Sequence, residues 1–293
     1  MDFFETLNFL ACSVAAVIFF YRWYSFIYKS RLPARSKKIK YVFAFLPLAS
    51  LFIIYYTLVG LASFDVVGDM FWTLYYVVMG YAWIYACLII MSLCFDLSWI
   101  DDGLNCGNLA AAAAIAGGVT GVTIIYSGAN IGDGPGWWCV LFAGALGTAA
   151  WVILGGVVNI AAKIFGQITV GRDFNCGVRT GCYFLAGGII LARASAGDWT
   201  SFKATAIEFM DGWPVLILTI AAIAAELYCD SKINTQPRYH SYSKSGAAAA
   251  EAATNNTLKI SIIIGVIFIL FAVLSVILLP PLPTNSIFRE MIR

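Results

Sequence analysis

The sequence predicts an all-α polytopic membrane protein with about eight transmembrane helices. Of its 293 residues, 61% are hydrophobic and only 12% are charged, about half the charged share of an ordinary soluble domain. Long apolar runs recur along the chain and are separated by short polar connections. A lipid environment accepts apolar side chains on the outside of a fold as well as inside it, so it suits this composition better than water does.

Each apolar run is long enough to cross about 30 Å of hydrocarbon. The chain begins with the acidic residues Asp2 and Glu5 and no basic residue. A secretory signal needs a positive start, so we expect the first run to be a retained helix. The seventh run is the shortest. The expected spans are 5–27, 41–63, 70–94, 106–127, 137–162, 175–195, 212–229 and 259–280.

The basic residues predict the orientation of the chain. They gather in the connection after the first span, which carries Lys29, Arg31, Arg35, Lys37 and Lys38. Placing this connection in the cytoplasm puts 14 of the 18 lysines and arginines on the cytoplasmic side, as the positive-inside rule requires. With an even number of helices, both termini are then expected to be extracytoplasmic.

These spans divide the chain into five expected parts. Residues 230–258 are polar and then alanine-rich, which is typical of a cytoplasmic linker that can hold a short helix across the alanines. The parts are two N-terminal transmembrane helices with a basic loop (1–69), a duplicated helical-hairpin domain (70–197), a seventh helix (198–229), the linker (230–258) and a C-terminal helix with its tail (259–293).

The central part contains an internal repeat. Asn105-Cys106-Gly107 and Ala116-Gly117-Gly118 return 70 residues later as Asn175-Cys176-Gly177 and Ala186-Gly187-Gly188. In both copies the motif lies on a helix that runs outward from the cytoplasm and follows a helix that runs inward. We therefore expect a parallel repeat of helical hairpins, with a pseudo-twofold axis along the membrane normal rather than the inverted arrangement of many transporters.

The inward helices share an acidic residue followed by tryptophan. An acidic side chain is favourable near the positive start of a helix, and tryptophan prefers the membrane interface. The pattern also suggests that the seventh helix begins a third, incomplete unit. The pairs are Asp69 with Trp72, Asp133 with Trp137 and Trp138, and Asp211 with Trp213.

The opening of the first copy resembles the YjfL-type bacterial inner-membrane family. Asn108-Leu109-Ala110-Ala111 is followed by spaced glycines, and the second copy is similar but has Val178 where the first has Asn108. The resemblance covers about residues 70–197. It implies duplicated hairpins in a bacterial cytoplasmic membrane, and it brings no known activity, because that family is a domain of unknown function.

The glycines of the repeat are the main packing candidates. Gly117 with Gly121, and Gly177 with Gly181, have the GxxxG spacing that brings two membrane helices into close contact. The same smooth faces could instead line a pore. The full set of helix-packing or pore-lining candidates is Gly117, Gly118, Gly121, Gly177, Gly181, Gly187 and Gly188.

Polar residues at the cytoplasmic ends of the helices form a second candidate set. Asn105, Asn108 and Asn175 are expected to cap helices, or alternatively to form a polar ring that coordinates an ion or solute at the cytoplasmic mouth. Arg179 and Glu226 lie at similar depth and are expected to pair. Charges at membrane depth are the default functional candidates.

The sequence gives no support for catalysis or for a cofactor. The single histidine, His240, lies in a polar loop, which disfavours a zinc or haem site and a nucleophile–base pair. The cysteines lie in or beside apolar segments without a CxxC pair, and we interpret them as apolar filling. They are Cys12, Cys87, Cys94, Cys106, Cys139, Cys176, Cys182 and Cys229.

Two functional hypotheses follow. The first is a non-catalytic membrane subunit or scaffold that packs through its small-residue faces against copies of itself or other membrane proteins. The second is a channel or transporter for a small solute or ion, with a path between the repeated hairpins. The expected partners are the lipid bilayer and membrane proteins, and no nucleic acid, because no basic folded domain is present.

Overall fold

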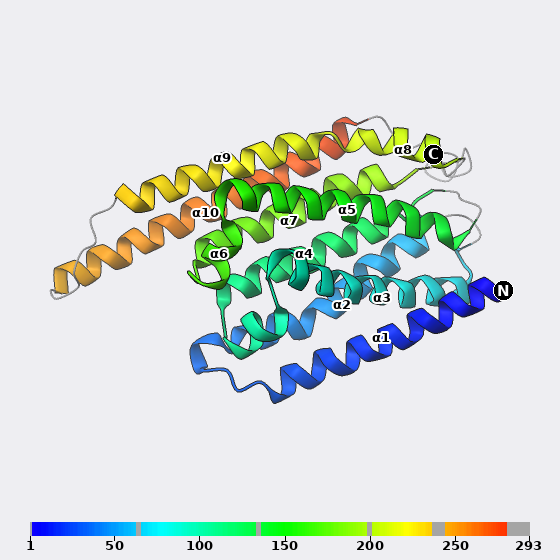
Figure 1. Ribbon diagram of the computed structural model, residues 1–293, viewed down its shortest axis with the longest axis horizontal. Coiled ribbons are helices and arrows are strands. Elements are labelled where there is room, and N and C mark those ends of the chain that lie inside the picture. The colour runs from blue at the N-terminus through cyan, green and yellow to red at the C-terminus, as the bar shows by residue number, and fades with distance from the viewer. Residues whose placement is uncertain (1, 63–65, 133–135, 198–200, 236–243, 280–293) are drawn as a thin grey trace.

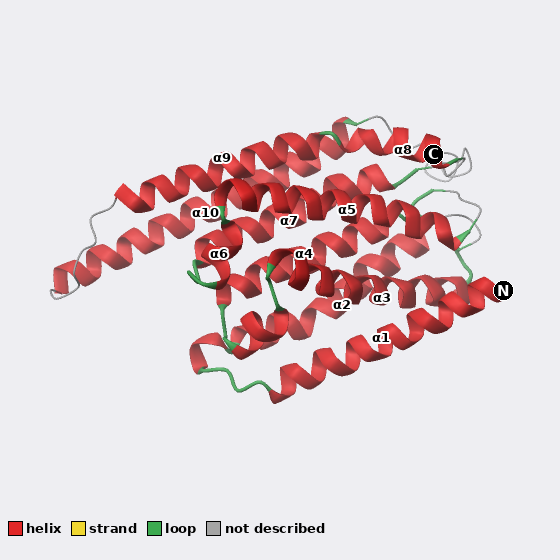
Figure 2. Cartoon of the chain, in the orientation of Figure 1, coloured by secondary structure: helices red, strands yellow, loops and turns green. Residues whose placement is uncertain are grey.

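The computed structural model describes residues 2–62, 66–132, 136–197, 201–235 and 244–279, with the side chains of 35, 204, 232–235 and 244–256 excepted. Helices account for nearly all of the described chain, and none of it forms a strand (Figure 2). The only bridge contacts in this part join Ala62 to Ile131 and Gly132. The expected all-α fold class is therefore confirmed.

Eight helices in the described ranges are long and apolar enough to span a membrane. They match the eight expected spans in order, so the chain is an integral, polytopic membrane protein. Their bounds are α1 Phe3–Lys29, α2 Lys38–Gly60, α3 Met70–Phe95, α4 Leu109–Gly128, α5 Trp137–Ala162, α7 Phe174–Ser195, α9 Pro214–Thr235 and α10 Lys244–Leu278.

Short helical elements lie in the connections between the long helices. A 3₁₀ turn, η1, joins α1 to α2, and a π-helical segment, η2, lies between α3 and α4. Their bounds, with those of the remaining short elements, are η1 Ala34–Ser36, η2 Trp99–Asn105, α6 Ile164–Thr169, α8 Phe202–Glu208 and η3 Phe209–Gly212.

The long helices form four hairpins that follow one another across the molecule, from α1 at the bottom of Figure 1 to α9 and α10 at the top. The second helices of the hairpins contact one another in a row, α2 on α4, α4 on α7 and α7 on α10. The first helices pack beside them, with α1 on α3 and α5 on α9. α9 therefore pairs with α10 as a complete fourth hairpin.

We call the end of the bundle that holds the connections 30–37, 96–108 and 163–173 the basic end. Hydrogen bonds link these three connections in series. Ser36 Oγ donates to the carbonyl of Gly107 at 2.9 Å, and Asn108 Nδ2 donates to the carbonyl of Ile168 at 2.8 Å. The start of α1 and the end of α10 both lie at the opposite end (Figure 1).

Helices α4 and α7 form the centre of the bundle. In each, 67% of the most apolar stretch is buried, against 11% in α1 and 22% in α10. The contact between α4 and α7 is the most extensive in the structure. The two most buried helices thus lie in the region predicted to be duplicated, and α1 and α10 are the least buried of the long helices.

Two predicted boundaries differ from the structure. The span expected at 106–127 begins at Leu109, because the preceding residues form η2 and a turn with a left-handed backbone at Gly107 (φ +59°). The linker expected at 230–258 is mostly helical, since α9 continues to Thr235 and α10 begins at Lys244. The alanine-rich stretch forms the first turns of α10, because alanine is the best helix former.

Of the acidic residues expected at helix starts, Asp69 caps a helix and Asp211 lies in a short helical turn before one. Asp69 caps α3 and accepts hydrogen bonds from the amides of Phe71 at 2.8 Å and Trp72 at 3.2 Å. Asp211 lies inside η3, one turn before α9. Asp133 lies outside the described residues.

The hairpins α3–α4 and α5–α7 have similar boundaries. α3 and α5 are both 26 residues long and start 67 residues apart. Asp96 and Lys163 end them in the same left-handed conformation, with φ of 50° and 52°. Asn108 caps α4 and Asp173 caps α7, 65 residues apart. The helix boundaries therefore correspond at offsets of 67 and 65 residues, and the offset of 70 seen in the sequence does not align them.

Candidate functional site

The contact between α4 and α7 is made by glycines at the points where the two backbones meet. A Cβ placed on Gly188 would lie 2.5 Å from Gly121 Cα, and one placed on Gly117 would lie 2.5 Å from Gly181 Cα. No side chain fits there, because real Cβ atoms do not approach backbone so closely. The glycines of this contact are Gly117, Gly121 and Gly128 on α4 and Gly177, Gly181 and Gly188 on α7.

The predicted close approach of the GxxxG faces therefore occurs, and it occurs within one chain. Gly177 and Gly181 lie against the backbone of α4 at Ala110 and Ala113. The helices touch along most of α4, from Ala110 to Gly128. Over this length the glycines line no space between the two helices, because the backbone of the other helix occupies that position.

The remaining two glycine candidates face other helices. A Cβ on Gly118 would meet Met91 Cε of α3 at 2.6 Å, and one on Gly187 would lie 3.7 Å from Trp151 Cδ1 of α5. Gly118 thus accommodates a large side chain, whereas Gly187 leaves room for an ordinary methyl contact. All seven candidates belong to the core formed by the two central hairpins.

Asn108 is the predicted cap that the structure confirms. Its Oδ1 accepts hydrogen bonds from the amides of Ala110 at 3.0 Å and Ala111 at 3.3 Å. Its Nδ2 donates to the carbonyl of Ile168, in the connection between α5 and α7. The side chain is buried, so Asn108 both starts α4 and ties one hairpin to the next. The two capped amides are those of the alanines in Asn108-Leu109-Ala110-Ala111.

Asn105 and Asn175 do not cap helices, contrary to the prediction. Asn105 is exposed at the end of η2 and donates to Asp101 Oδ1 at 3.2 Å. Asn175 lies in the first turn of α7, where its own amide donates to the actual cap, Asp173, at 2.9 Å. Its side chain donates to Thr257 Oγ1 of α10 at 3.3 Å. The three asparagines are therefore in three different environments and do not form a ring.

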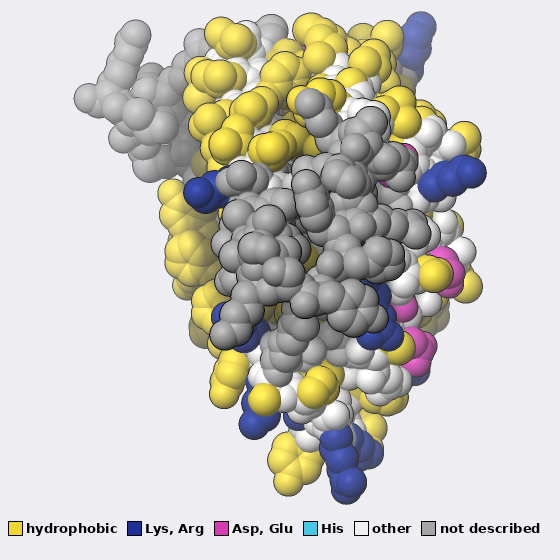
Figure 3. Space-filling model, turned by 90° about the vertical axis from the view of Figure 1, so that its left-hand side faces the viewer, with side chains coloured by type: hydrophobic (Ala, Val, Ile, Leu, Met, Phe, Trp, Pro, Cys, Tyr) yellow, Lys and Arg dark blue, Asp and Glu magenta, His cyan; other side chains and the backbone are white. Residues whose placement is uncertain are grey.

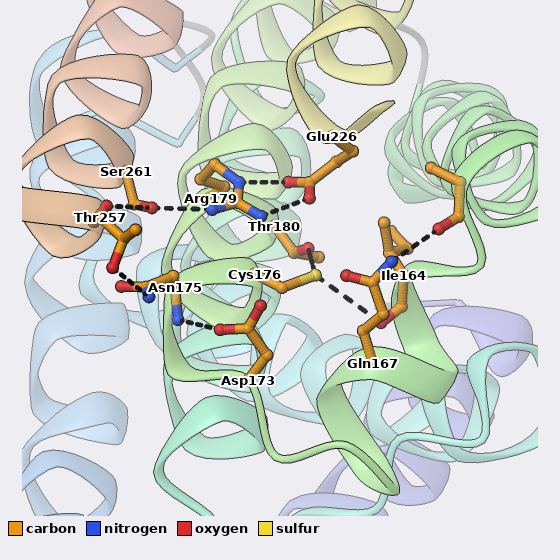
Figure 4. Close-up of polar contacts among 11 residues, drawn as sticks. Ile164, Gln167, Asp173, Asn175, Cys176, Arg179, Thr180, Glu226, Thr257 and Ser261 are labelled. Carbon is orange, nitrogen blue, oxygen red and sulfur yellow. Dashed lines mark hydrogen bonds and ion pairs between the residues drawn. The ribbon is translucent and has the colours of Figure 1, made fainter. Parts of the chain in front are cut away.

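The predicted pair of Arg179 and Glu226 is confirmed. Arg179 Nε and Nη2 donate to the two carboxylate oxygens of Glu226 at 2.7 and 2.6 Å, which is a bidentate contact between α7 and α9. The two side chains are only 3% and 5% exposed. A third nitrogen, Arg179 Nη1, donates to Ser261 Oγ of α10 at 2.7 Å. One guanidinium thus joins three helices near the basic end (Figure 4).

Further polar contacts extend from this ion pair toward the basic end. Ser261 Oγ donates to the carbonyl of Thr257 at 3.0 Å, and Thr257 accepts the side-chain bond from Asn175 described above. The next residue, Cys176, has its sulfur 3.8 Å from the carbonyl of Ile164 in α6. We call Arg179, Glu226, Ser261, Thr257 and Asn175 the α7–α9–α10 polar cluster.

Sequence reasoning missed Ser261 and Thr257. The signal was their spacing of four residues, which places two hydroxyls on one face of an otherwise apolar helix. It also missed a neighbouring contact one turn further along α7, where the hydroxyls of Tyr183 and Thr219 lie 3.0 Å apart. α7 therefore contacts α9 and α10 through polar side chains. It contacts α4 through glycines, backbone against backbone.

The connection between α3 and α4 carries a partly buried carboxyl group. Burial raises the pKa of Asp102 above its ordinary value, while the hydrogen bond from the amide of Ser98 opposes this shift. That bond is 2.8 Å long. Asp101 and Asp102 both lie in the π-helical segment η2.

No three side chains of histidine, cysteine, aspartate or glutamate come together as metal ligands within the described ranges. The eight cysteines are free, and four of them are buried. His240 lies outside the described residues. The arrangement at the α7–α9–α10 polar cluster can hold helices together or bind a charged group, and the cluster offers no arranged nucleophile and base.

No family model, curated protein or solved structure matches this chain.

Proposed function

We propose that this protein is a non-catalytic integral membrane subunit or scaffold, built on a duplicated pair of helical hairpins and acting in a homo- or hetero-oligomeric assembly. The observation that carries the proposal is the backbone contact between α4 and α7, from Ala110 to Gly128. The alternative, a path between the two hairpins, needs open space at this position.

The proposal places the assembly surface away from the glycine faces. Those faces are occupied within the chain, so a partner would meet the outer helices, of which α1 and α10 are the least buried. We further propose that the hairpins arose by duplication, that the membrane is the bacterial cytoplasmic membrane, and that the basic connection is cytoplasmic with both termini outside. The resemblance to YjfL-type proteins and the distribution of lysine and arginine support these assignments.

A channel or transporter remains the second candidate, and the α7–α9–α10 polar cluster favours it. Buried ionisable groups at membrane depth commonly mark ion or solute pathways. In this alternative the path would run beside Arg179 and Glu226, between α7 and the last hairpin, rather than between α4 and α7.

One experiment separates the two functions. The full chain is extracted with its native lipid in nanodiscs and its mass is measured, and the purified chain is tested for salt conductance in planar bilayers. The proposal expects a complex of fixed stoichiometry and no conductance above that of protein-free bilayers. A monomer with a conductance that changes in the Glu226→Gln variant would contradict the proposal and support the alternative.

A further inference from the structure

We propose that the turn between α1 and α2 is a binding site for the headgroup phosphate of an anionic phospholipid. The site is a pocket of about 230 Å³ at the basic end. It is lined by Ser30, Arg31, Leu32, Lys37, Lys40 and Tyr41. The inference is independent of the proposed function and of which side of the membrane this end faces.

The pocket carries an excess of positive charge. Three of its six lining residues are the cations Arg31, Lys37 and Lys40, and none is acidic. Within the described part of the chain no carboxylate pairs with them, since the ion pair found there is that of Arg179 with Glu226. An anion would therefore meet three cations whose charge is not already compensated, which is the condition for strong phosphate binding.

The pocket is held in shape by hydrogen bonds between α1 and α2. Lys40 Nζ donates to the carbonyl of Ser30 at 2.6 Å, which fixes one ammonium group at the pocket wall. Trp23 Nε1 donates to the carbonyl of Phe43 at 2.9 Å and holds the two helices together. A preformed site loses less entropy on binding than a mobile basic loop does.

The start of α2 adds to the attraction for an anion. This helix of 23 residues begins at Lys38, and its N-cap residue, Lys37, makes no side-chain cap hydrogen bond. The start of a helix carries a partial positive charge and amides that lack intrahelical partners. Lys37 lines the pocket, so the uncapped helix start lies beside it.

An apolar stripe continues from the pocket along α2 and favours a lipid over a free phosphate. Tyr41 lines the pocket and is 76% exposed. The same helix face continues with Phe45, Leu48 and Phe52, because positions four, seven and eleven residues apart share one side of a helix. These three side chains are also exposed. An acyl chain can lie along this stripe while its phosphate occupies the pocket.

Figure 3 looks directly at the basic end of the molecule. Lysine and arginine side chains gather at its lower edge, where the α1–α2 turn lies, and hydrophobic side chains border them. Positive charge next to an apolar surface matches the two parts of an anionic phospholipid. It also distinguishes this turn from a purely solvated basic loop.

The test compares two double variants of the full chain that each remove two positive charges from residues 29–38. Arg31→Gln with Lys37→Gln alters the pocket and leaves the bond from Lys40 to Ser30 intact. Lys29→Gln with Lys38→Gln alters exposed residues that do not line the pocket. Binding of dioleoyl phosphatidylglycerol to each detergent-purified protein is measured by native mass spectrometry, with zwitterionic dioleoyl phosphatidylcholine as the comparison that has no net charge.

We expect the pocket variant to bind phosphatidylglycerol about 25-fold more weakly than the unaltered chain, since each of the two basic residues removed contributes roughly fivefold to binding of an anionic lipid. The control variant should change affinity by less than about threefold, and phosphatidylcholine should bind weakly to all three proteins. Equal losses in the two variants would overturn the proposal, because they would indicate general charge attraction without a site.

Two further arms separate the lipid from free phosphate. Inorganic phosphate in tenfold molar excess over the lipid should not displace phosphatidylglycerol, and dihexanoyl phosphatidylglycerol should bind more weakly than the dioleoyl lipid, because its chains cover less of the stripe. Displacement by phosphate, or equal affinity for both chain lengths, would assign the pocket to a free anion and overturn the lipid proposal. Unchanged thermal unfolding of both variants confirms that they are folded.

Discussion

The hairpins α3–α4 and α5–α7 have similar helix boundaries, but different polar contacts hold them against their neighbouring helices. In the first, neutral hydrogen bonds hold the second helix: Thr123 pairs with Ser50 at 3.0 Å, and Tyr126 donates to the carbonyl of Tyr76 at 2.6 Å. In the second, α7 uses a buried ion pair with α9. The second helices of the two hairpins, α4 and α7, contact each other through glycines. A common fold therefore tolerates different polar contacts on its outer side, while the shared contact between the hairpins requires small residues.

The largest expected effect tests the ion pair, which only the second hairpin has. Glu226→Ala leaves Arg179 buried without its counter-charge, so we expect the free energy of unfolding to fall by about 3–5 kcal/mol. The measurement is unfolding in mixed micelles followed by circular dichroism.

The matched control for the ion pair replaces both partners with apolar residues of similar size, Arg179→Met with Glu226→Leu. This double variant should recover most of the lost stability, because no uncompensated charge is left in the interior. A double variant as unstable as the single one would show that the charges do not act as a pair.

The next effect tests the tie between the two hairpins. Asn108→Leu removes the cap of α4 and the bond to the carbonyl of Ile168, so we expect a loss of about 2 kcal/mol. The same change at exposed Asn105 should cost less than about 0.5 kcal/mol. If both variants unfold alike, Asn108 does not have the role assigned to it.

A smaller effect is expected at the corresponding cap of the second hairpin. Asp173 accepts one amide bond, from Asn175, and makes no tie like that of Asn108 among its described contacts. Asp173→Ala should therefore cost about 1 kcal/mol, and Asp173→Asn should retain the cap. Chemical unfolding of the two variants side by side measures the difference, and a loss as large as that of Asn108→Leu would argue against the comparison.

The smallest effect is a pH dependence confined to the first hairpin. Burial raises the folded-state pKa of Asp102, so the folded chain binds this proton more tightly than the unfolded chain does. The resulting stability is present at low pH and is lost as the pH rises through the raised pKa. Stability curves of the unaltered chain and Asp102→Asn should converge at low pH, and curves that stay parallel across this range would contradict the assignment. Helix α6, in the connection of the second hairpin, contains no acidic residue.

Much of the fold could be predicted from the sequence, because lipid imposes a minimum length on every apolar span. The pair of Arg179 and Glu226 was also predictable, since two opposite charges at one depth have a strong reason to meet. The α10 boundary was not, because the alanines of 244–258 lie among polar residues and resemble a linker. Their helical propensity continues a helix that the membrane span already nucleates.

The helix caps do not follow the offset of 70 residues seen in the sequence. The structurally corresponding caps are Asn108 and Asp173, which are different residue types with the same capping ability. The identical residues Asn105 and Asn175 lie in different local structures. Comparison by identity therefore selected the offset of 70, whereas capping chemistry and helix ends select 65 and 67. Ser261 and Thr257 were missed because single hydroxyls in an apolar helix usually bond to their own backbone.

The central claim is that α4 and α7 meet backbone to backbone within one chain. Its most direct test is the free energy of unfolding of Gly121→Ala beside Gly156→Ala, at two ratios of protein to detergent. Gly121 faces the backbone of α7, whereas a Cβ on Gly156 of α5 would meet nothing within 4 Å. We predict a loss of about 1–3 kcal/mol for Gly121→Ala, almost none for Gly156→Ala, and the same values at both ratios. Equal effects of the two substitutions, or a loss that depends on protein concentration, would contradict the claim.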